Sequence, residues 1–201
     1  MDRLPANDPR FDEIIFTSEE IASRIREMAT EIHRDFGDSE GVLLVGILKG
    51  VAPFQTDLAR ALSVDGMIHL RMGFLRASTY GSGIKSDGEK ERKVDIIWLG
   101  MPQDAKNILL LDDVLDQGFT LSAVKTALQE RYPNANVRTA VMLSKQVENA
   151  TEEVRKLRST FQPDYVGFQA PDRWIVGYGL DIAEDFRELP YIATVYEKYF
   201  M

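Results

Sequence analysis

The sequence contains no cysteine, no long apolar run and no block of like charge. Without cysteine, the chain has no disulfide framework and no thiolate chemistry. The longest apolar run, around Val42–Leu48, is far shorter than the ~20 residues that a membrane helix needs. The first residues, MDRLPANDPRFDE, lack the apolar centre of a secretory signal. We therefore expect a cytoplasmic protein without a membrane partner.

The charge balance argues against nucleic acid as the main partner. The 201 residues carry a formal net charge of −8, whereas a nucleic-acid-binding protein needs a basic face. Hydrophobic residues make up 44% of the chain and charged residues 28%, as is typical of a globular protein. The length suits one domain with a full core.

Apolar runs and helical patterns alternate along the chain, which predicts an α/β fold with a parallel sheet. The expected strands are Val42–Leu48, Met67–Leu75, Val94–Leu99, Asn107–Asp112, Val137–Leu143, Tyr165–Phe168 and Ile192–Val195. The expected helices run from a capping box at Thr17 and Glu20 to about Phe36, around Pro53–Leu62, over Thr120–Tyr132 and over Asn149–Arg158. Between two of the strands, Ala77–Arg92 is rich in glycine, serine and charge, so a long exposed loop or a hairpin arm is expected.

The most informative segment is Ile108–Leu121, which reads ILLLDDVLDQGFTL. Its apolar run is typical of a strand buried on both faces of a parallel sheet, and ligands bind beyond the carboxyl ends of such strands. Gly118 lets the backbone approach a ligand closely. A helix that begins near Phe119 or Thr120 directs N–H groups and a positive dipole end into the loop, which favours a phosphate.

Three aspartates precede that predicted helix. Asp112 and Asp113 could accept hydrogen bonds from sugar hydroxyls or hold a divalent cation that prefers oxygen ligands. Together with the phosphate loop, they predict a ribose phosphate site. The alternative is a solvated acidic turn in which Asp116 caps the helix.

This segment resembles the phosphoribosyl-pyrophosphate (PRPP) signature of the type I phosphoribosyltransferases. The matching positions are Asp112, Asp113, Asp116, Gly118 and Thr120. The chain departs from the signature at Gln117, where Thr or Ser is usual, and at Phe119, where Lys is frequent. Gln117 removes a hydroxyl that could bind phosphate, so we expect backbone N–H groups and Thr120 to bind the phosphate.

Other segments resemble the hypoxanthine-guanine phosphoribosyltransferases, in the same order along the chain. The first active-site loop is matched by Leu44–Phe54, LVGILKGVAPF, and the mobile catalytic loop by Ser78–Ser86, STYGSGIKS. The purine-binding segment is matched by Pro163–Asp181, PDYVGFQAPDRWIVGYGLD. The resemblance implies a single phosphoribosyltransferase domain, with a core over about 37–168, a hood from about 1–16 and 169–201, and a flexible loop.

The resemblance also implies the reaction. A Mg²⁺-dependent enzyme of purine salvage transfers the phosphoribosyl group of PRPP to hypoxanthine or guanine, giving IMP or GMP and pyrophosphate. One alternative is an enzyme that prefers xanthine and guanine. Another is a non-catalytic PRPP- or nucleotide-sensing regulator on the same fold, although the acidic net charge disfavours a regulator that binds nucleic acid. The resemblance further implies a homodimer or homotetramer.

The resemblance assigns roles to residues of this chain. Asp116 is the general base at N7 of the purine, and Thr79 and Tyr80 close over the reacting centre. PRPP and nucleotide binding falls to Lys49, Gly50, Asp112, Asp113, Asp116, Gln117, Gly118, Phe119, Thr120 and Arg187. The purine is bound by Lys145, Trp174, Ile175 and Asp181, and Mg²⁺ by Asp181, Asp112 and Asp113. The bond between Leu48 and Lys49 is expected to be cis.

Overall fold

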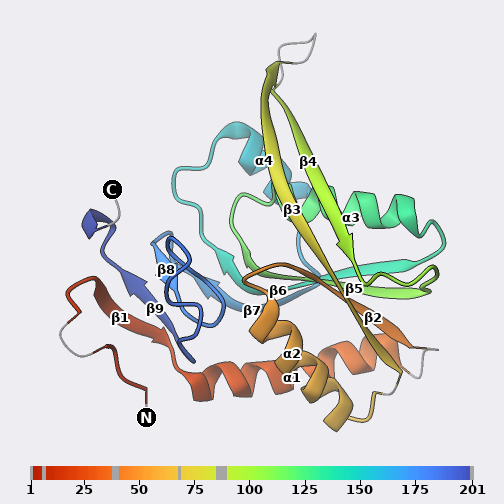
Figure 1. Cartoon of the computed structure of the whole chain (residues 1–201), viewed down its shortest axis with the longest axis horizontal. Coiled ribbons are helices and arrows are strands. Elements are labelled where there is room, and N and C mark those ends of the chain that lie inside the picture. Colours follow the sequence, from red (N-terminus) through yellow and green to blue (C-terminus); the bar gives the residue numbers. More distant parts are fainter. Residues whose placement is uncertain (1, 6–7, 38–40, 68, 85–89, 200–201) are drawn as a thin grey trace.

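A computed structural model describes residues 2–5, 8–37, 41–67, 69–84 and 90–199, with the side chains of 79–93 left out. Its main feature is a six-stranded sheet in the order β4-β3-β2-β5-β6-β7 (Figure 1). All neighbours in this sheet are parallel except β3 and β4, which form an antiparallel hairpin. The strands are β2 (Val42–Ile47), β3 (Leu70–Ile84), β4 (Lys90–Leu99), β5 (Asn107–Leu115), β6 (Asn136–Lys145) and β7 (Tyr165–Ala170).

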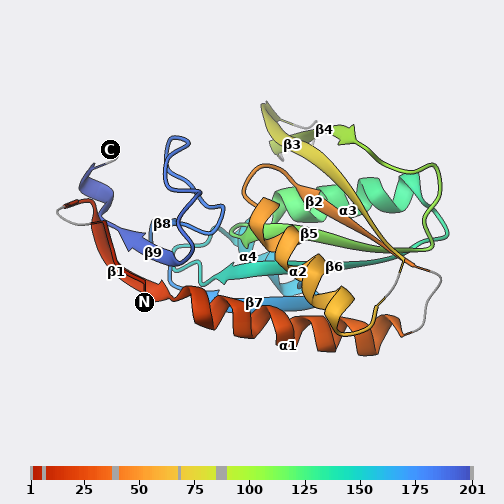
Figure 2. The same cartoon turned by 60° about the horizontal axis from the view of Figure 1, so that its bottom comes forward.

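Helices cover both faces of this sheet (Figure 2). α1 (Ser18–Phe36) and α2 (Ala52–Val64) lie on one face, and α3 (Phe119–Arg131) lies on the other. α4 (Glu152–Thr160) joins β6 to β7. Successive residues of the central strands point to opposite faces, so Leu44 packs in the cluster of α1 and α2 while Leu43 packs in that of α3. The central strands are therefore apolar throughout.

A second, three-stranded antiparallel sheet joins the two ends of the described chain, and we call it the terminal sheet. Its order is β1 (Phe11–Phe16), β9 (Ile192–Val195), β8 (Ile175–Val176). The short 3-10 helix η1 (Glu197–Tyr199) follows β9. The terminal sheet lies beyond the carboxyl ends of β6 and β7 (Figure 1). It therefore stands at the edge of the main sheet where ligands of parallel sheets bind.

The predicted α/β fold with a parallel sheet is confirmed. The capping box is present, because the Thr17 hydroxyl accepts from the N–H of Glu20 and the Glu20 carboxylate accepts from the N–H of Thr17. Of the two expectations for the glycine-rich stretch, the hairpin arm is confirmed as far as Ile84 and Lys90, which pair across β3 and β4. None of the described helices has the length and apolar character needed to cross a membrane.

Some boundaries and elements differ from the predictions. β5 continues to Leu115, three residues past its predicted end, because main-chain pairing with β6 persists through the polar residues. The strand expected from Met67 begins at Leu70. β1 and β8 were not predicted as strands, since each depends on pairing with the distant β9.

Candidate active site

The carboxyl end of β5 and the start of α3 form a loop beside a cavity of about 400 Å³. Residues of the predicted phosphate segment line it, namely Asp112, Asp116, Gln117, Gly118, Phe119 and Thr120. Gly118 is the N-cap of α3 and has a φ of 93°, a conformation that favours glycine. Glycine offers no side chain to cap the first N–H groups of the helix, so these donors and the helix dipole suit an anion.

Asp116 does not cap α3, so the alternative prediction of a capping aspartate is wrong. The N-cap is Gly118, and in the part of the chain that the structure describes no side-chain hydrogen bond caps this helix. The carboxylate of Asp116 is instead exposed and lines the cavity. It is therefore accessible to a substrate, as a general base must be.

Asp112 and Asp113 form a tightly placed acidic pair at the end of β5. Asp112 is only 8% exposed, and its carboxylate accepts a hydrogen bond from the backbone N–H of Asp113 at 3.1 Å. Burial, and then the neighbouring charge of Asp113, raise the pKa of Asp112 well above its usual range. Burial also raises the pKa of Asp113, although Arg187 opposes this shift. At Asp113, burial thus outweighs the positive charge of Arg187, which favours the ionised form.

The raised pKa of Asp112 predicts a stability cost at neutral pH. The folded state keeps a proton that the unfolded state loses, so the free energy of unfolding falls as pH rises above the ordinary aspartate value. The slope for one group reaches about 1.4 kcal/mol per pH unit. Asp112→Asn retains the acceptor for Asp113 and removes this cost. We expect the variant to be more stable than the wild type at pH 7 in urea denaturation with EDTA, and to lose this advantage near pH 4. Parallel stability curves would contradict the prediction.

The three cationic side chains that are predicted to bind the substrate each form an ion pair with a carboxylate. The ammonium of Lys49 lies 2.8 Å from Glu184, and the bond between Leu48 and Lys49 is cis, as expected. The guanidinium of Arg187 lies 2.7 Å from Asp181 and 3.4 Å from Glu184. On the other side of the site, the ammonium of Lys145 lies 3.5 Å from Asp172.

Two backbone loops meet next to the acidic pair. A Cβ added to Gly50 would lie 1.6 Å from a carboxylate oxygen of Asp113, and one added to Gly179 would lie 1.9 Å from the carbonyl oxygen of Gly50. Arg187 fixes the second loop by donating to the carbonyl oxygen of Gly179 at 2.7 Å. Gly50, Asp113, Gly179 and Arg187 are therefore brought together, although they lie far apart in the sequence.

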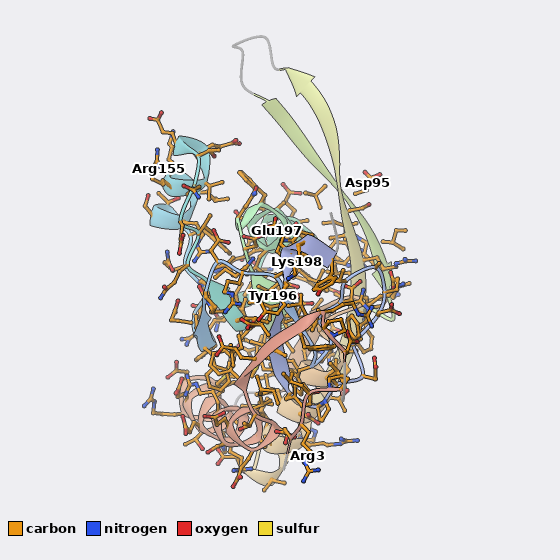
Figure 3. All side chains as sticks on the ribbon, turned by 90° about the vertical axis from the view of Figure 1, so that its left-hand side faces the viewer. Arg3, Asp95, Arg155, Tyr196, Glu197 and Lys198 are labelled. Atoms are coloured by element: carbon orange, nitrogen blue, oxygen red, sulfur yellow. The ribbon has the colours of Figure 1, made fainter. Side chains whose placement is uncertain are left out.

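Three of the predicted purine-binding residues lie at the end of β6 and in or next to β8 of the terminal sheet, namely Lys145, Trp174 and Ile175. Lys145 is the last residue of β6. Trp174 is 42% exposed, and its indole N–H donates to Glu197 at 3.3 Å. Figure 3 labels Glu197, which belongs to η1. Ile175 pairs with Thr194 of β9. An indole ring offers the flat area that stacking on a purine requires.

Thr79 and Tyr80 lie in β3 opposite Val94 and Lys93, but their side chains lie outside the described part of the structure.

The three predicted metal ligands are Asp112, Asp113 and Asp181. No group of three or more histidine, aspartate or glutamate side chains is placed to hold a metal ion within the described ranges. One reason is that Asp181 is engaged by Arg187 and by the N–H of Glu184. The assignment of Mg²⁺ to Asp112, Asp113 and Asp181 stays a prediction. The adjacent carboxyl groups of Asp112 and Asp113 offer oxygen donors to a Mg²⁺ that brings further ligands from a substrate.

Sequence reasoning missed several partners at this site. Glu184 and Asp172 hold the predicted cations, and Arg158 of α4 reaches the ends of both β5 and β6. Acidic residues are frequent in the segment from 172 to 188, but nothing in their spacing indicated which of them would meet Lys49, 135 residues away.

Comparison with known proteins identifies the family of the chain. A model of the phosphoribosyl transferase domain matches residues 13–183. The hypoxanthine-guanine phosphoribosyltransferase of Dictyostelium discoideum is 36% identical over 186 residues, which cover 92% of this chain and 96% of that protein. That of Aquifex aeolicus is also 36% identical, over 90% of this chain and 93% of that protein.

Solved structures give the same result. A Trypanosoma cruzi hypoxanthine phosphoribosyltransferase matches with a TM-score of 0.77 and 29% identity, covering 98% of this chain and 97% of that one. A Staphylococcus aureus hypoxanthine phosphoribosyltransferase matches with a TM-score of 0.76 and 30% identity, covering 98% and 100%. Fold, domain and sequence identity over most of the chain show that it belongs to the hypoxanthine-guanine phosphoribosyltransferases, enzymes of the type I phosphoribosyltransferase family.

Proposed function

We propose that this enzyme transfers the 5-phosphoribosyl group of PRPP to hypoxanthine or guanine and releases IMP or GMP with pyrophosphate. Its family places it in purine salvage. The observation that carries the finer proposal is the exposed Asp116, beside a glycine-capped helix N-terminus, the buried Asp112 and the half-buried Asp113. This arrangement offers a base, an anion site and diol acceptors within one loop.

The residues of this loop have distinct roles in the proposed reaction. Asp116 accepts the proton from N7 of the purine while a ring nitrogen bonds to the anomeric carbon and the bond to pyrophosphate breaks. Asp112 and Asp113 bind the ribose hydroxyls and stabilise the positive charge that develops on the sugar. The backbone from Asp116 to Thr120 binds the 5′-phosphate. Thr79 and Tyr80 are proposed to exclude water from the reacting centre.

Mg²⁺ is the proposed cofactor. Bound with PRPP, it would neutralise pyrophosphate oxygens and make that group easier to displace. Asp112 and Asp113 would hold it, with Asp181 contributing through water. Lys49 and Arg187 would bind the pyrophosphate by exchanging their carboxylate partners for phosphate oxygens.

The relatives support the substrate proposal. One solved structure with 29% identity is described as a ternary substrates complex of a T. cruzi hypoxanthine phosphoribosyltransferase. We propose that the terminal sheet, with residues 1–16 and 169–201, serves as a hood over a core formed by residues 37–168. We also propose a cytoplasmic homodimer or homotetramer that binds neither nucleic acid nor membranes.

An absorbance assay tests this function. The enzyme is incubated with PRPP and Mg²⁺ and with hypoxanthine, guanine, xanthine or adenine in turn. Nucleotide formation from hypoxanthine or guanine is expected, and adenine should be inert. A preference for xanthine would support the alternative of a xanthine-guanine enzyme. The absence of product with every base would contradict catalysis and favour a PRPP-sensing regulator.

Lys145 is predicted to select 6-oxopurines, because its ammonium would donate to the exocyclic oxygen. A hydrogen bond to a charged group contributes about 1.5–3 kcal/mol, so Lys145→Gln should lower kcat/KM for hypoxanthine by about 10- to 100-fold. Lys156→Gln, on the exposed surface of α4, is the control. Equal kcat/KM values in Lys145→Gln and the wild type would refute this role.

A further inference from the structure

Arg158, in the last turn of α4, reaches across to the ends of two neighbouring strands. Its guanidinium donates to the carbonyl oxygen of Leu115 at 3.2 Å and to that of Asp116. The same group donates to the Ser144 hydroxyl at 3.0 Å and to the carbonyl oxygen of Lys145 at 3.1 Å. One side chain therefore joins the loop after β5 to the end of β6.

The guanidinium of Arg158 lies at the point where main-chain pairing between β5 and β6 ends. The last paired residues of β5 and β6 are Leu115 and Ser144. Beyond this pair, the strand-end carbonyl oxygens need donors from elsewhere. Arginine suits the task, because its planar guanidinium carries five N–H donors in a fixed fork and can reach several acceptors at once.

The side chain of Arg158 also packs against the predicted phosphate loop at Gly118. A Cβ added at Gly118 would lie 3.6 Å from the Cδ of Arg158 and 3.6 Å from Leu157, so α4 packs against the start of α3. On its other side, Arg158 lines a cavity of about 330 Å³ together with Lys145. The side chain thus lies between the loop that carries Asp116 and the strand end that carries Lys145.

The acceptors of Arg158 are three carbonyls and one hydroxyl, none of which carries a full negative charge. Burial accordingly lowers the pKa of Arg158, and the negative charge of Asp116 partly offsets this shift. These four contacts are directional hydrogen bonds of the planar guanidinium, and none of them is an ion pair.

We propose that Arg158 is a positioning residue. It fixes the position of Asp116 relative to Lys145, so that the base and the purine-selecting cation can contact the same purine. The inference rests on the proposed function, which gives these two residues their roles. Without the guanidinium fork, the loop after β5 can shift relative to the end of β6. A displacement of about 1 Å at a reacting group lowers turnover by about 10²-fold.

The test compares Arg158→Ala, Arg158→Lys and the control Arg155→Ala. Arg155 lies on the same helix, lines the same cavity and is exposed (Figure 3). We measure kcat and KM for PRPP and hypoxanthine, the melting temperature, and recovery of activity on addition of guanidinium ion at millimolar concentration. Wild-type turnover is established first, so a failure of the proposed function is seen before any variant is compared.

Arg158→Ala and Arg158→Lys should both lower kcat/KM by about 10²-fold at a temperature where they remain folded. Guanidinium should restore at least a tenth of the lost activity to Arg158→Ala and leave Arg155→Ala unchanged. Near-wild-type activity of Arg158→Lys would show that only the charge matters and would overturn the proposal. A loss that merely follows the unfolded fraction, or no loss in Arg158→Ala, would overturn it as well.

Discussion

Replacement of Asp116 by asparagine is expected to lower kcat by about 10²- to 10⁴-fold, the range that general acid–base catalysis contributes. The amide has the size of the carboxylate but cannot take a proton from the purine. Since Gly118 rather than Asp116 caps α3, the substitution leaves the fold of the loop intact. Affinity for PRPP should therefore change little. Steady-state kinetics with hypoxanthine and calorimetric titration with PRPP measure the two quantities separately.

The matched control for this experiment is Asp104→Asn, because the side chain of Asp104 is 96% exposed. It should leave kcat and PRPP affinity unchanged. A loss of PRPP binding in Asp116→Asn that parallels the loss of kcat would show that Asp116 anchors the loop instead of acting as a base. Unchanged kcat would remove Asp116 from the reaction altogether.

Replacement of Gly179 by alanine is expected to lower the free energy of unfolding by about 2–6 kcal/mol. The residue has a φ of 98°, which costs an alanine about 1–3 kcal/mol. Its new Cβ would also lie 1.9 Å from the carbonyl oxygen of Gly50 and 3.1 Å from Pro53, and such overpacking typically costs a further 1–3 kcal/mol, as an approximate range. Urea denaturation measures the loss.

Gly100→Ala is the control for Gly179→Ala. Gly100 also has a positive φ, of 64°, but an added Cβ would meet no atom within 4 Å. Gly100→Ala therefore measures the cost of backbone strain without the steric clash that Gly179→Ala adds. If the two variants lose the same stability, the contact between the loops of Gly50 and Gly179 contributes nothing. Because Gly50 follows Lys49, we expect the folded fraction of Gly179→Ala to show a raised KM for PRPP.

Local patterns predicted the central part of the fold well. The apolar run before Asp112 indicated a buried strand, and the spacing of Thr17 and Glu20 indicated a helix start, because both signals depend on near neighbours in the chain. The hairpin of β3 and β4 was only one of two expectations, since main-chain pairing does not require apolar residues. β1 escaped prediction because its register is set by β9.

In the candidate site too, only the features that are local in sequence could be predicted. The loop around Asp116 could be predicted because its aspartates, glycine and helix start are contiguous. The pairing of Lys49 with Glu184 and the reach of Arg158 to Leu115 could not, because each joins segments that only the folded sheet brings together. The departure at Gln117 from the family signature still leaves Gly118 and the start of α3 as the predicted anion site.

The terminal sheet has a consequence for the order in which the protein forms during synthesis. Phe11 pairs with Val195, so β1 must wait for almost the whole chain before it gains its partner strand. The six-stranded sheet contains only residues from 42 to 170 and can assemble earlier. Chains grow at about 5–20 residues per second, so β1 stays unpaired for roughly 10–40 s after it is made. Until β9 emerges, the apolar face of β1 is exposed to other nascent chains and to chaperones.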